Sequence, residues 1–229
     1  MLDYVNWFRH STPYINQHRD CTFVLLLPGE AMIHANFNNI IHDIMLLNSL
    51  GVRLVLVHGS RPQIEERLAL RGIRSQYHND LRVTDIDTLS CVIDAVGSLR
   101  IAIEARLCAQ QSGSRLRVVS GNLVTAKPIG VVDGVDFHHT GEVRRIDRKA
   151  ITRHLDEQNI VLLSSLGYSP TGEAFNLACE DVATSVAVAL GADKLILFGE
   201  DTGIRDEDGE LLRELKPTRA APLLAKLGN

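Results

Sequence analysis

Two apolar segments near the start of the chain constrain its fold most strongly. Residues 23–27 run without interruption into Pro28-Gly29-Glu30, and residues 54–57 run into His58-Gly59-Ser60. Continuous apolar runs of this length are typical of strands buried on both faces of a parallel sheet. Backbone N–H groups in glycine turns at the carboxyl ends of such strands often hold anions. The pair predicts an α/β protein with a ligand site at these turns, although a plain strand-to-helix turn would leave the same pattern.

Helical and strand patterns alternate along most of the chain. Apolar residues recur at helical spacing in residues 36–50, and Gly51 follows where a helix C-terminus favours glycine. Ser60-Arg61-Pro62-Gln63 has the composition of a capping box, with Ser60 as N-cap, and Thr84 predicts the cap of a helix reaching residue 109. We also expect helices at 147–158, 180–190 and 218–227, strands at 52–57, 160–164 and 194–198, short β pieces at 115–147, and hairpins near 169–172 and 208–209. This alternation predicts a three-layer α/β/α sandwich with a mostly parallel central sheet.

An N-terminal helix is expected to precede the sheet. Residues 3–18 carry several large apolar side chains, including the single tryptophan, and Pro13 is expected to break or kink this helix. Its aromatic face either packs on its own domain or forms a subunit contact, and the sequence favours neither alternative. We therefore divide the chain into an N-terminal helix and oligomerisation segment, residues 1–18, and a domain formed by residues 19–229.

Composition narrows the class of partner. The formal net charge is −4 and the Lys and Arg residues are scattered, which argues against nucleic acid. No apolar run approaches the roughly 18–20 residues that span a bilayer, and the N-terminus lacks the features of a signal peptide. The four cysteines form no CxxC pair, so we expect reduced, buried thiols in a cytoplasmic protein. His138 and His139 are adjacent and would point to opposite faces of a strand, so we assign no metal site.

Several longer strings, in the right order, resemble the amino-acid kinase family. The strings shared with acetylglutamate kinase are the two glycine turns and residues 81–85, 175–176, 180–183 and 202–204. The chain most resembles the kinase-like N-terminal domain of N-acetylglutamate synthases, through residues 8–16, 59–64, 77–78, 119–122, 141–147 and 171–173. The resemblance covers residues 20–229 and implies the amino-acid kinase fold, which is the carbamate kinase-like fold.

The resemblance also implies that phosphoryl transfer is lost. Kinases of this family carry a first-strand lysine in a Lys-x-Gly-Gly turn, and this sequence has Leu26-Leu27-Pro28-Gly29 there. Ser60 and Arg61 replace glycines beside Gly59, and Glu180 replaces an aspartate that organises the family's lysines. Removing one group that stabilises transition-state charge typically lowers a rate by orders of magnitude. An active acetylglutamate kinase remains the alternative.

A small-molecule pocket is expected to survive the loss of this chemistry. The resemblance places Arg82 where the kinase holds a substrate carboxylate, a role that suits a guanidinium, and Asn176 where it contacts the acylamino acid. The alternatives are a plain ion pair of Arg82 with Asp80 or Asp85, and a turn role for Asn176. The candidate residues of this vestigial pocket are Gly29, Gly59, Ser60, Arg82, Asn176 and Glu180.

The transferase chemistry of the resembled proteins is expected to lie outside this chain. In N-acetylglutamate synthases a C-terminal domain transfers acetyl from acetyl-CoA to L-glutamate, the first step of arginine biosynthesis. The string nearest to its CoA-binding loop, residues 110–115, ends wrongly. We therefore expect no catalytic residue and no cofactor in this chain, acetyl-CoA serving the absent domain, and a truncated C-terminal end.

The resemblance implies arginine sensing and assembly instead. In that family L-arginine binds as an allosteric effector near the N-terminal helix and the C-terminal lobe, and this helix interlaces kinase-like dimers into hexamers. Tyr14 is our candidate arginine contact, with a place in a helix interface as the alternative. We expect a homo-oligomer, from dimer to hexamer. A purely structural assembly module is the remaining hypothesis.

Overall fold

The computed structural model describes residues 2–109, 116–199, 203–206, 209–218 and 220–222. Residues 1–198 form one unit and residues 199–229 a second, and each unit is described by itself. The proposed boundary after residue 18 stays a prediction. The string at residues 110–115 and most of the helix expected at 218–227 lie outside the described residues.

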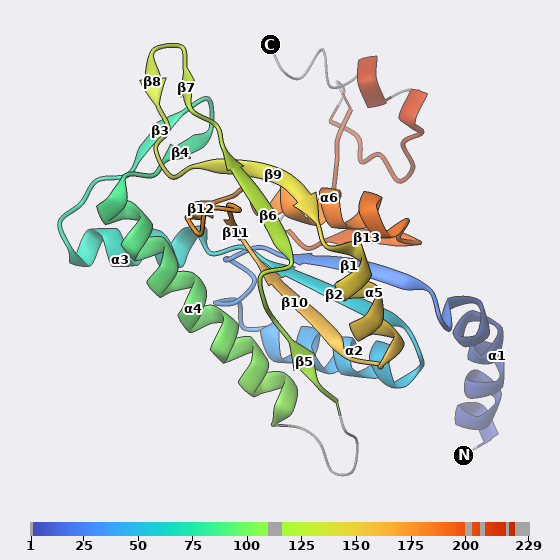
Figure 1. Cartoon of the computed structure of the whole chain (residues 1–229). Helices are drawn as coiled ribbons and strands as arrows, with labels where there is room; N and C mark the ends of the chain where they lie inside the picture. The colour runs from blue at the N-terminus through green and yellow to red at the C-terminus, as the bar shows by residue number, and fades with distance from the viewer. Residues whose placement is uncertain (1, 110–115, 200–202, 207–208, 219, 223–229) are drawn as a thin grey trace. The chain divides into compact units, whose positions relative to one another are not determined.

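A parallel sheet of five strands forms the centre of the first unit (Figure 1). The strands are β1 (Thr22–Leu27), β2 (Arg53–His58), β5 (Val118–Val119), β10 (Ile160–Ser164) and β13 (Lys194–Leu197). Their order is β13-β1-β2-β10-β5, and every neighbouring pair is parallel. The strands predicted at 23–27, 52–57, 160–164 and 194–198 are thereby confirmed within a residue or two at each end.

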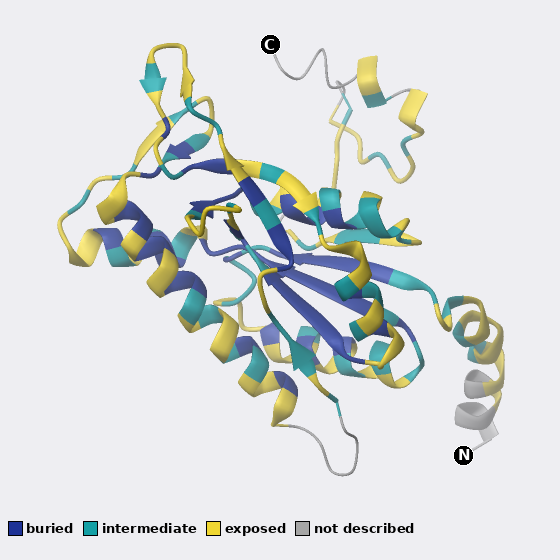
Figure 2. Cartoon of the chain, viewed as in Figure 1, coloured by how far each residue is buried: buried dark blue, intermediate teal, exposed yellow. Residues whose placement is uncertain are grey.

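Helices cover both faces of this sheet, which confirms the three-layer α/β/α architecture. The helices are α2 (Phe37–Ser49) and α4 (Ile86–Cys108) on one face, and α5 (Arg148–Asp156) and α6 (Cys179–Leu190) on the other. Because side chains alternate along a strand, Leu25 of β1 joins the core under α2 and α4, while Leu26 joins the core under α5 and α6. Between these layers β1, β2 and β10 are almost entirely buried, whereas the edge strands β5 and β13 are partly exposed (Figure 2).

Shorter strands build a second, mixed sheet and two hairpins. The sheet has the order β12-β11-β6-β9, formed by β6 (Val124–Pro128), β9 (Gly141–Ile146), β11 (Leu166–Tyr168) and β12 (Ala174–Asn176). The hairpins are β3 (Gln76–His78) with β4 (Leu81–Val83), and β7 (Val131–Val132) with β8 (Val135–Asp136). His78 Nε2 and Asn79 Nδ2 each lie 3.3 Å from Asp133 Oδ2, so the two hairpins contact each other.

Helix α1 (Leu2–His18) corrects one prediction about the N-terminus. It continues through Pro13, so the predicted break is wrong. A proline inside a helix removes one backbone donor and strains the preceding turn, but the remaining hydrogen bonds can hold the helix together.

Two predicted helix caps also need correction. Asp85, not Thr84, caps α4, because its Oδ1 accepts a 2.8 Å hydrogen bond from the Thr88 N–H. Ser60 does occupy the N-cap position of α3 (Arg61–Leu70), but its hydroxyl makes no capping bond. Its Oγ lies 3.3 Å from Ser165 Oγ instead, and Gln63 bonds to Gly29 rather than closing a capping box.

The cysteines are all free thiols, but the expectation that all four are buried is wrong. Cys91 is buried in α4, whereas Cys108 is exposed at the end of the same helix. Cys21 and Cys179 are partly exposed. Burial along α4 follows the helical period, so two cysteines on one helix meet different surroundings.

Two negative findings concern only the part of the chain that the structure describes. None of its helices combines the length and apolar character needed to cross a membrane. No three His, Cys, Asp or Glu side chains gather there in a way that could hold a metal ion. His138 Nδ1 lies 3.5 Å from Asp136 Oδ2, while the ring of His139 packs 6.1 Å from that of Phe175.

Candidate ligand-binding site

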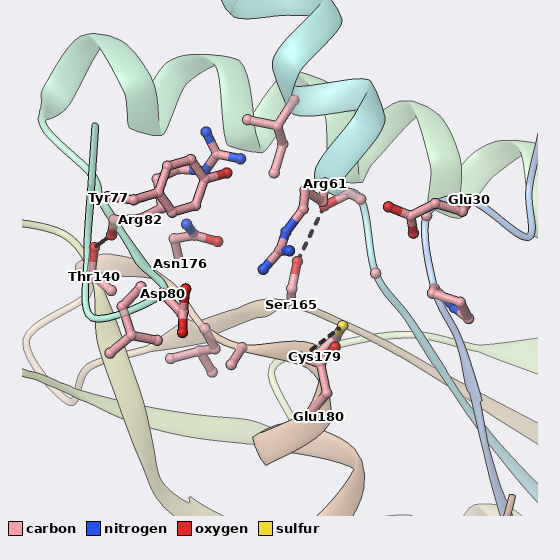
Figure 3. A pocket seen from close by; sticks show the side chains of 18 residues that line it. Glu30, Arg61, Tyr77, Asp80, Arg82, Thr140, Ser165, Asn176, Cys179 and Glu180 are labelled. Atoms are coloured by element: carbon pink, nitrogen blue, oxygen red, sulfur yellow. Dashed lines mark hydrogen bonds between the residues drawn. The ribbon is translucent and has the colours of Figure 1, made fainter. Parts of the chain in front are cut away.

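A cavity of about 160 Å³ lies where the parallel strands end. Its walls come from the two glycine turns, the start of α3, the β3–β4 hairpin and the β12–α6 connection (Figure 3). The structure brings all six predicted pocket residues to it, namely Gly29, Gly59, Ser60, Arg82, Asn176 and Glu180. Their contact with a ligand stays a prediction.

The first glycine turn is filled by protein atoms. Gln63 Nε2 donates a 2.8 Å hydrogen bond to the Gly29 carbonyl. A Cβ atom at Gly29 would lie 2.6 Å from Pro62 Cδ and 2.7 Å from Gln63 Oε1, closer than packed atoms come. The N-terminal turn of α3 therefore sits directly against Gly29.

The second glycine turn is packed against the first. The Gly59 N–H donates a 2.8 Å hydrogen bond to the Leu27 carbonyl, so this amide is not available to an anion. A Cβ atom at Gly59 would lie 3.0 Å from Cys179 Sγ and 3.2 Å from the Gly29 nitrogen. We call this side of the cavity, formed by Gly29, Gly59, Pro62 and Gln63, the closed end.

Leu26 belongs to the core and not to the cavity. Its side chain is 3% exposed and lies in the apolar cluster under α5 and α6, together with Phe175 and Val182. It does not line the cavity. At the position where the resemblance places a kinase lysine, this chain therefore offers an apolar side chain that contributes to stability.

Arg82 is engaged inside the protein. Its guanidinium pairs with Glu65 Oε1 at 2.8 Å, donates to Ser75 Oγ and lies 4.8 Å from the centre of the Tyr77 ring. The alternative partners Asp80 and Asp85 are therefore wrong, because α3 supplies the carboxylate. Burial alone would raise the pKa of Glu65, but hydrogen bonds from Ser75, Tyr77 and Arg82 hold it below the usual value.

Asn176 is a buried strand residue rather than a turn residue. It is 8% exposed at the end of β12, and its Nδ2 donates a 3.1 Å hydrogen bond to Thr84 Oγ1. Thr140 Oγ1 lies 2.9 Å from the same hydroxyl and bonds to the Arg82 carbonyl. The Thr84 hydroxyl, which the sequence predicts as the cap of α4, thus bonds to Asn176 in this wall of the cavity.

Several cavity residues were not predicted. They are Arg61, Tyr77, Asp80, Thr140, Ser165 and Cys179. The most informative is Arg61, whose side chain points into the cavity (Figure 3). Within the described residues its guanidinium has no ion pair or hydrogen bond, and its nearest aromatic contact is the Tyr77 ring, 6.0 Å away. Arg61 stands where the resembled kinases have a glycine, and this replacement was the sequence signal that could have identified it.

Two titratable groups near the closed end are electrically neutral at neutral pH. Burial, reinforced by the neighbouring Glu180 carboxylate, raises the pKa of the Cys179 thiol to about 12. Burial lowers the pKa of His58, which has no solvent exposure, to about 4. Neither is therefore suited to nucleophilic or acid–base chemistry at neutral pH.

Tyr14, the candidate arginine contact, is not part of this cavity. It lies on α1 and is 70% exposed. A role for Tyr14 would therefore require a separate site.

The chain has relatives among known proteins. The sequence model of the amino acid kinase family matches residues 22–223. The amino-acid acetyltransferase of Pseudomonas putida is 68% identical over 234 residues, a match that covers 100% of this chain and 54% of the relative. The Pseudomonas fluorescens protein of the same name is also 68% identical, with the same coverage. The chain thus spans about half the length of these curated relatives.

Solved structures agree with this assignment. N-acetylglutamate synthase from Neisseria gonorrhoeae, complexed with coenzyme A and L-arginine, matches with a TM-score of 0.88 and 39% identity, over 97% of this chain and 53% of that one. Carbamate kinase from Giardia lamblia, at 16% identity and a TM-score of 0.63, shares the fold alone. The chain belongs to the amino acid kinase family.

Proposed function

We propose that this chain is the regulatory and assembly domain of an N-acetylglutamate synthase, and that it does not transfer phosphoryl groups. The whole protein would acetylate L-glutamate with acetyl-CoA in the cytoplasm, in a domain outside these residues. The observation that carries the proposal is the closed end of the cavity, where α3 fills the space beside Gly29.

The closed end and Leu26 support the proposed loss of phosphoryl transfer. Transfer of a phosphoryl group depends mainly on positioning and on cations that neutralise its charge. The Gly59 N–H already donates to the Leu27 carbonyl, and Leu26 is buried in the core. Arg82 is already paired with Glu65. A nucleotide phosphate would therefore meet packed protein atoms and no lysine.

Arginine sensing is supported by the similarity to a synthase that was solved with L-arginine bound. In this chain we place the effector at α1, with Tyr14 as a contact, because its ring is exposed and available. The same helix would join subunits into a homo-oligomer.

Thermal unfolding with added ligands tests this proposal. Millimolar L-arginine should raise the melting temperature, since a ligand at about 100 times its dissociation constant stabilises a protein by about 2.7 kcal/mol. ATP, Mg²⁺ and N-acetyl-L-glutamate together should give no acylphosphate product. Tyr14→Ala should weaken the arginine effect, whereas Tyr168→Ala, at an exposed tyrosine of β11, should not.

Each part of the proposal can fail separately. ATP-dependent phosphorylation would overturn the loss of kinase activity. A melting temperature unmoved by L-arginine would overturn arginine sensing. If light scattering gave the same oligomer after deletion of residues 1–18, assembly through α1 would be wrong.

A further inference from the structure

The charges lining the cavity do not balance. Three carboxylates face it, those of Glu30, Asp80 and Glu180. Of the two guanidinium groups in its walls, that of Arg82 is already neutralised by Glu65, which is not a lining residue. Arg61 is left as the one cation without an ion pair among the described lining residues. The cavity therefore has an excess of negative charge, which attracts ligands that carry positive groups.

The remaining polar groups are arranged around Arg61. Figure 3 shows its guanidinium reaching into the cavity, with Asn176 and Asp80 on one side and Glu180 on the other. Asn176 donates its Nδ2 hydrogen to Thr84, and in the described residues its amide oxygen has no hydrogen bond. This side chain is more than nine-tenths buried and turns its oxygen toward the cavity (Figure 3). An amide oxygen that faces the cavity without a protein partner can accept a hydrogen bond from a ligand.

We propose that this cavity binds a free α-amino acid with a basic side chain. The α-carboxylate pairs with Arg61, and the α-ammonium group donates to the Asn176 amide oxygen and the Asp80 carboxylate. The positively charged side chain lies toward Glu180 and Glu30. We call the part of the cavity wall formed by Arg61, Asp80 and Asn176 the open end.

The same arrangement selects against acylated amino acids and nucleotides. Acylation removes the ammonium group that the Asn176 oxygen and Asp80 require. A dicarboxylate such as N-acetylglutamate would bring two negative charges to a cavity that already has an excess. At about 160 Å³ the cavity is smaller than the roughly 300–1,000 Å³ of pockets that take drug-sized ligands, so it suits a single amino acid.

This inference rests on the proposed loss of phosphoryl transfer, because an anionic cavity repels the phosphates of a nucleotide. It does not rest on arginine sensing at α1. Binding in the cavity should survive Tyr14→Ala, whereas binding at α1 should survive changes at Arg61 and Asp80.

Calorimetric titration of the whole chain tests the proposal. The probes are L-lysine, L-arginine, L-glutamate, N-acetyl-L-glutamate and agmatine, which lacks the carboxylate of arginine. L-lysine and L-arginine should bind, and agmatine and both glutamate compounds should bind at least about tenfold more weakly. Arg61→Gln and Asp80→Asn should each weaken L-lysine binding at least about tenfold. Asparagine suits position 80, where φ is +60°.

The controls separate this site from α1 and from general effects of charge. Arg148→Gln, at an exposed cation of α5, and Tyr14→Ala should leave L-lysine binding unchanged. Circular dichroism confirms that each variant is folded. The proposal is overturned if L-lysine fails to bind, if both cavity variants bind it normally, or if N-acetyl-L-glutamate binds more tightly. If L-arginine binding disappears only in Tyr14→Ala, arginine sensing stands and the cavity proposal falls.

Discussion

The closed end and the open end of the cavity differ in how closely protein atoms pack against them. At the closed end, Gly29 and Gly59 are pressed against Pro62, Gln63 and Cys179, and their backbone groups bond to the protein itself. At the open end, Arg61 and Asp80 have no hydrogen bond or ion pair within the described residues. The closed end is tightly packed, although Gln63 Oε1 is buried there without a hydrogen-bond partner, and the open end has charged groups that make no ion pair within the described residues.

With the proposed loss of phosphoryl transfer, this difference means that the fold has lost a reaction and kept its pocket. The backbone groups of the two glycine turns are part of the packing. The groups that would recognise a small molecule still face the cavity. Changes at the closed end should therefore act on stability, and changes at the open end on binding.

The largest expected effect concerns the neutral His58 beside the closed end. Its pKa of about 4 in the folded chain lies below the usual histidine value of 6.5, so the unfolded chain takes up a proton first as the pH falls. The contribution of neutral His58 to the free energy of unfolding is fully present above pH 6.5. It is lost as the pH falls from 6.5 to 4, which lowers the free energy of unfolding by about 3 kcal/mol. Urea unfolding across this range should show a smaller pH dependence in His58→Gln than in the parent chain.

The matched control for this experiment is His42→Gln, at an exposed position of α2. It should keep the pH dependence of the parent chain. An unchanged pH dependence in His58→Gln would mean that the closed end does not hold a neutral imidazole.

A smaller loss is expected when the closed end is overpacked. In Gly29→Ala the new methyl group would lie 2.6 Å from Pro62 Cδ, so α3 must move. Overpacking of this kind destabilises by about 2 kcal/mol, measurable by urea unfolding. Gly121→Ala adds a methyl group with no atom within 4 Å and should change stability by less than about 0.5 kcal/mol. Equal stability of the two variants would show that the closed end has room after all.

The smallest effect is expected near the open end. Tyr77→Phe removes the hydroxyl that donates a 2.9 Å hydrogen bond to Glu65 Oε1. Because Tyr77 is 44% exposed, water replaces much of this bond, and unfolding should become easier by only about 0.5 kcal/mol. The pKa of Glu65 should rise, as followed by NMR titration, since one of the bonds that lower it is gone. A loss as large as that of Gly29→Ala would contradict the contrast between the two ends.

The regular part of the fold was predictable because it depends on local pattern. The helix expected at 36–50 is observed as Phe37–Ser49, and the strand expected at 23–27 as Thr22–Leu27. Burial on one stripe of a helix, or on both faces of a strand, leaves a period that can be read in a single sequence. Gly191, with φ of +61°, ends α6 in the same predictable way.

The site was predictable only as a set of backbone positions. The partners of its side chains come from distant segments, as the 105 residues between Ser60 and Ser165 illustrate. Local pattern assigned Ser60 to a cap and offered Asp80 or Asp85 only as alternative partners of Arg82, whereas the tertiary fold supplied Ser165 and Glu65. Arg61 was visible in the sequence as an altered glycine, but its freedom from partners appears only when the neighbours are placed.

The pairing of β1 with β13 has a consequence for the order in which the chain acquires its fold. Thr22 N–H donates to Asp193 Oδ2 across 171 residues, and β13 is one of the two direct neighbours of β1. During synthesis at about 5–20 residues per second, the outer edge of β1 therefore waits roughly 10–30 s for its partner to leave the ribosome. Throughout that interval an apolar strand presents unpaired backbone groups, so newly made chains are vulnerable to mispairing at this edge until β13 emerges.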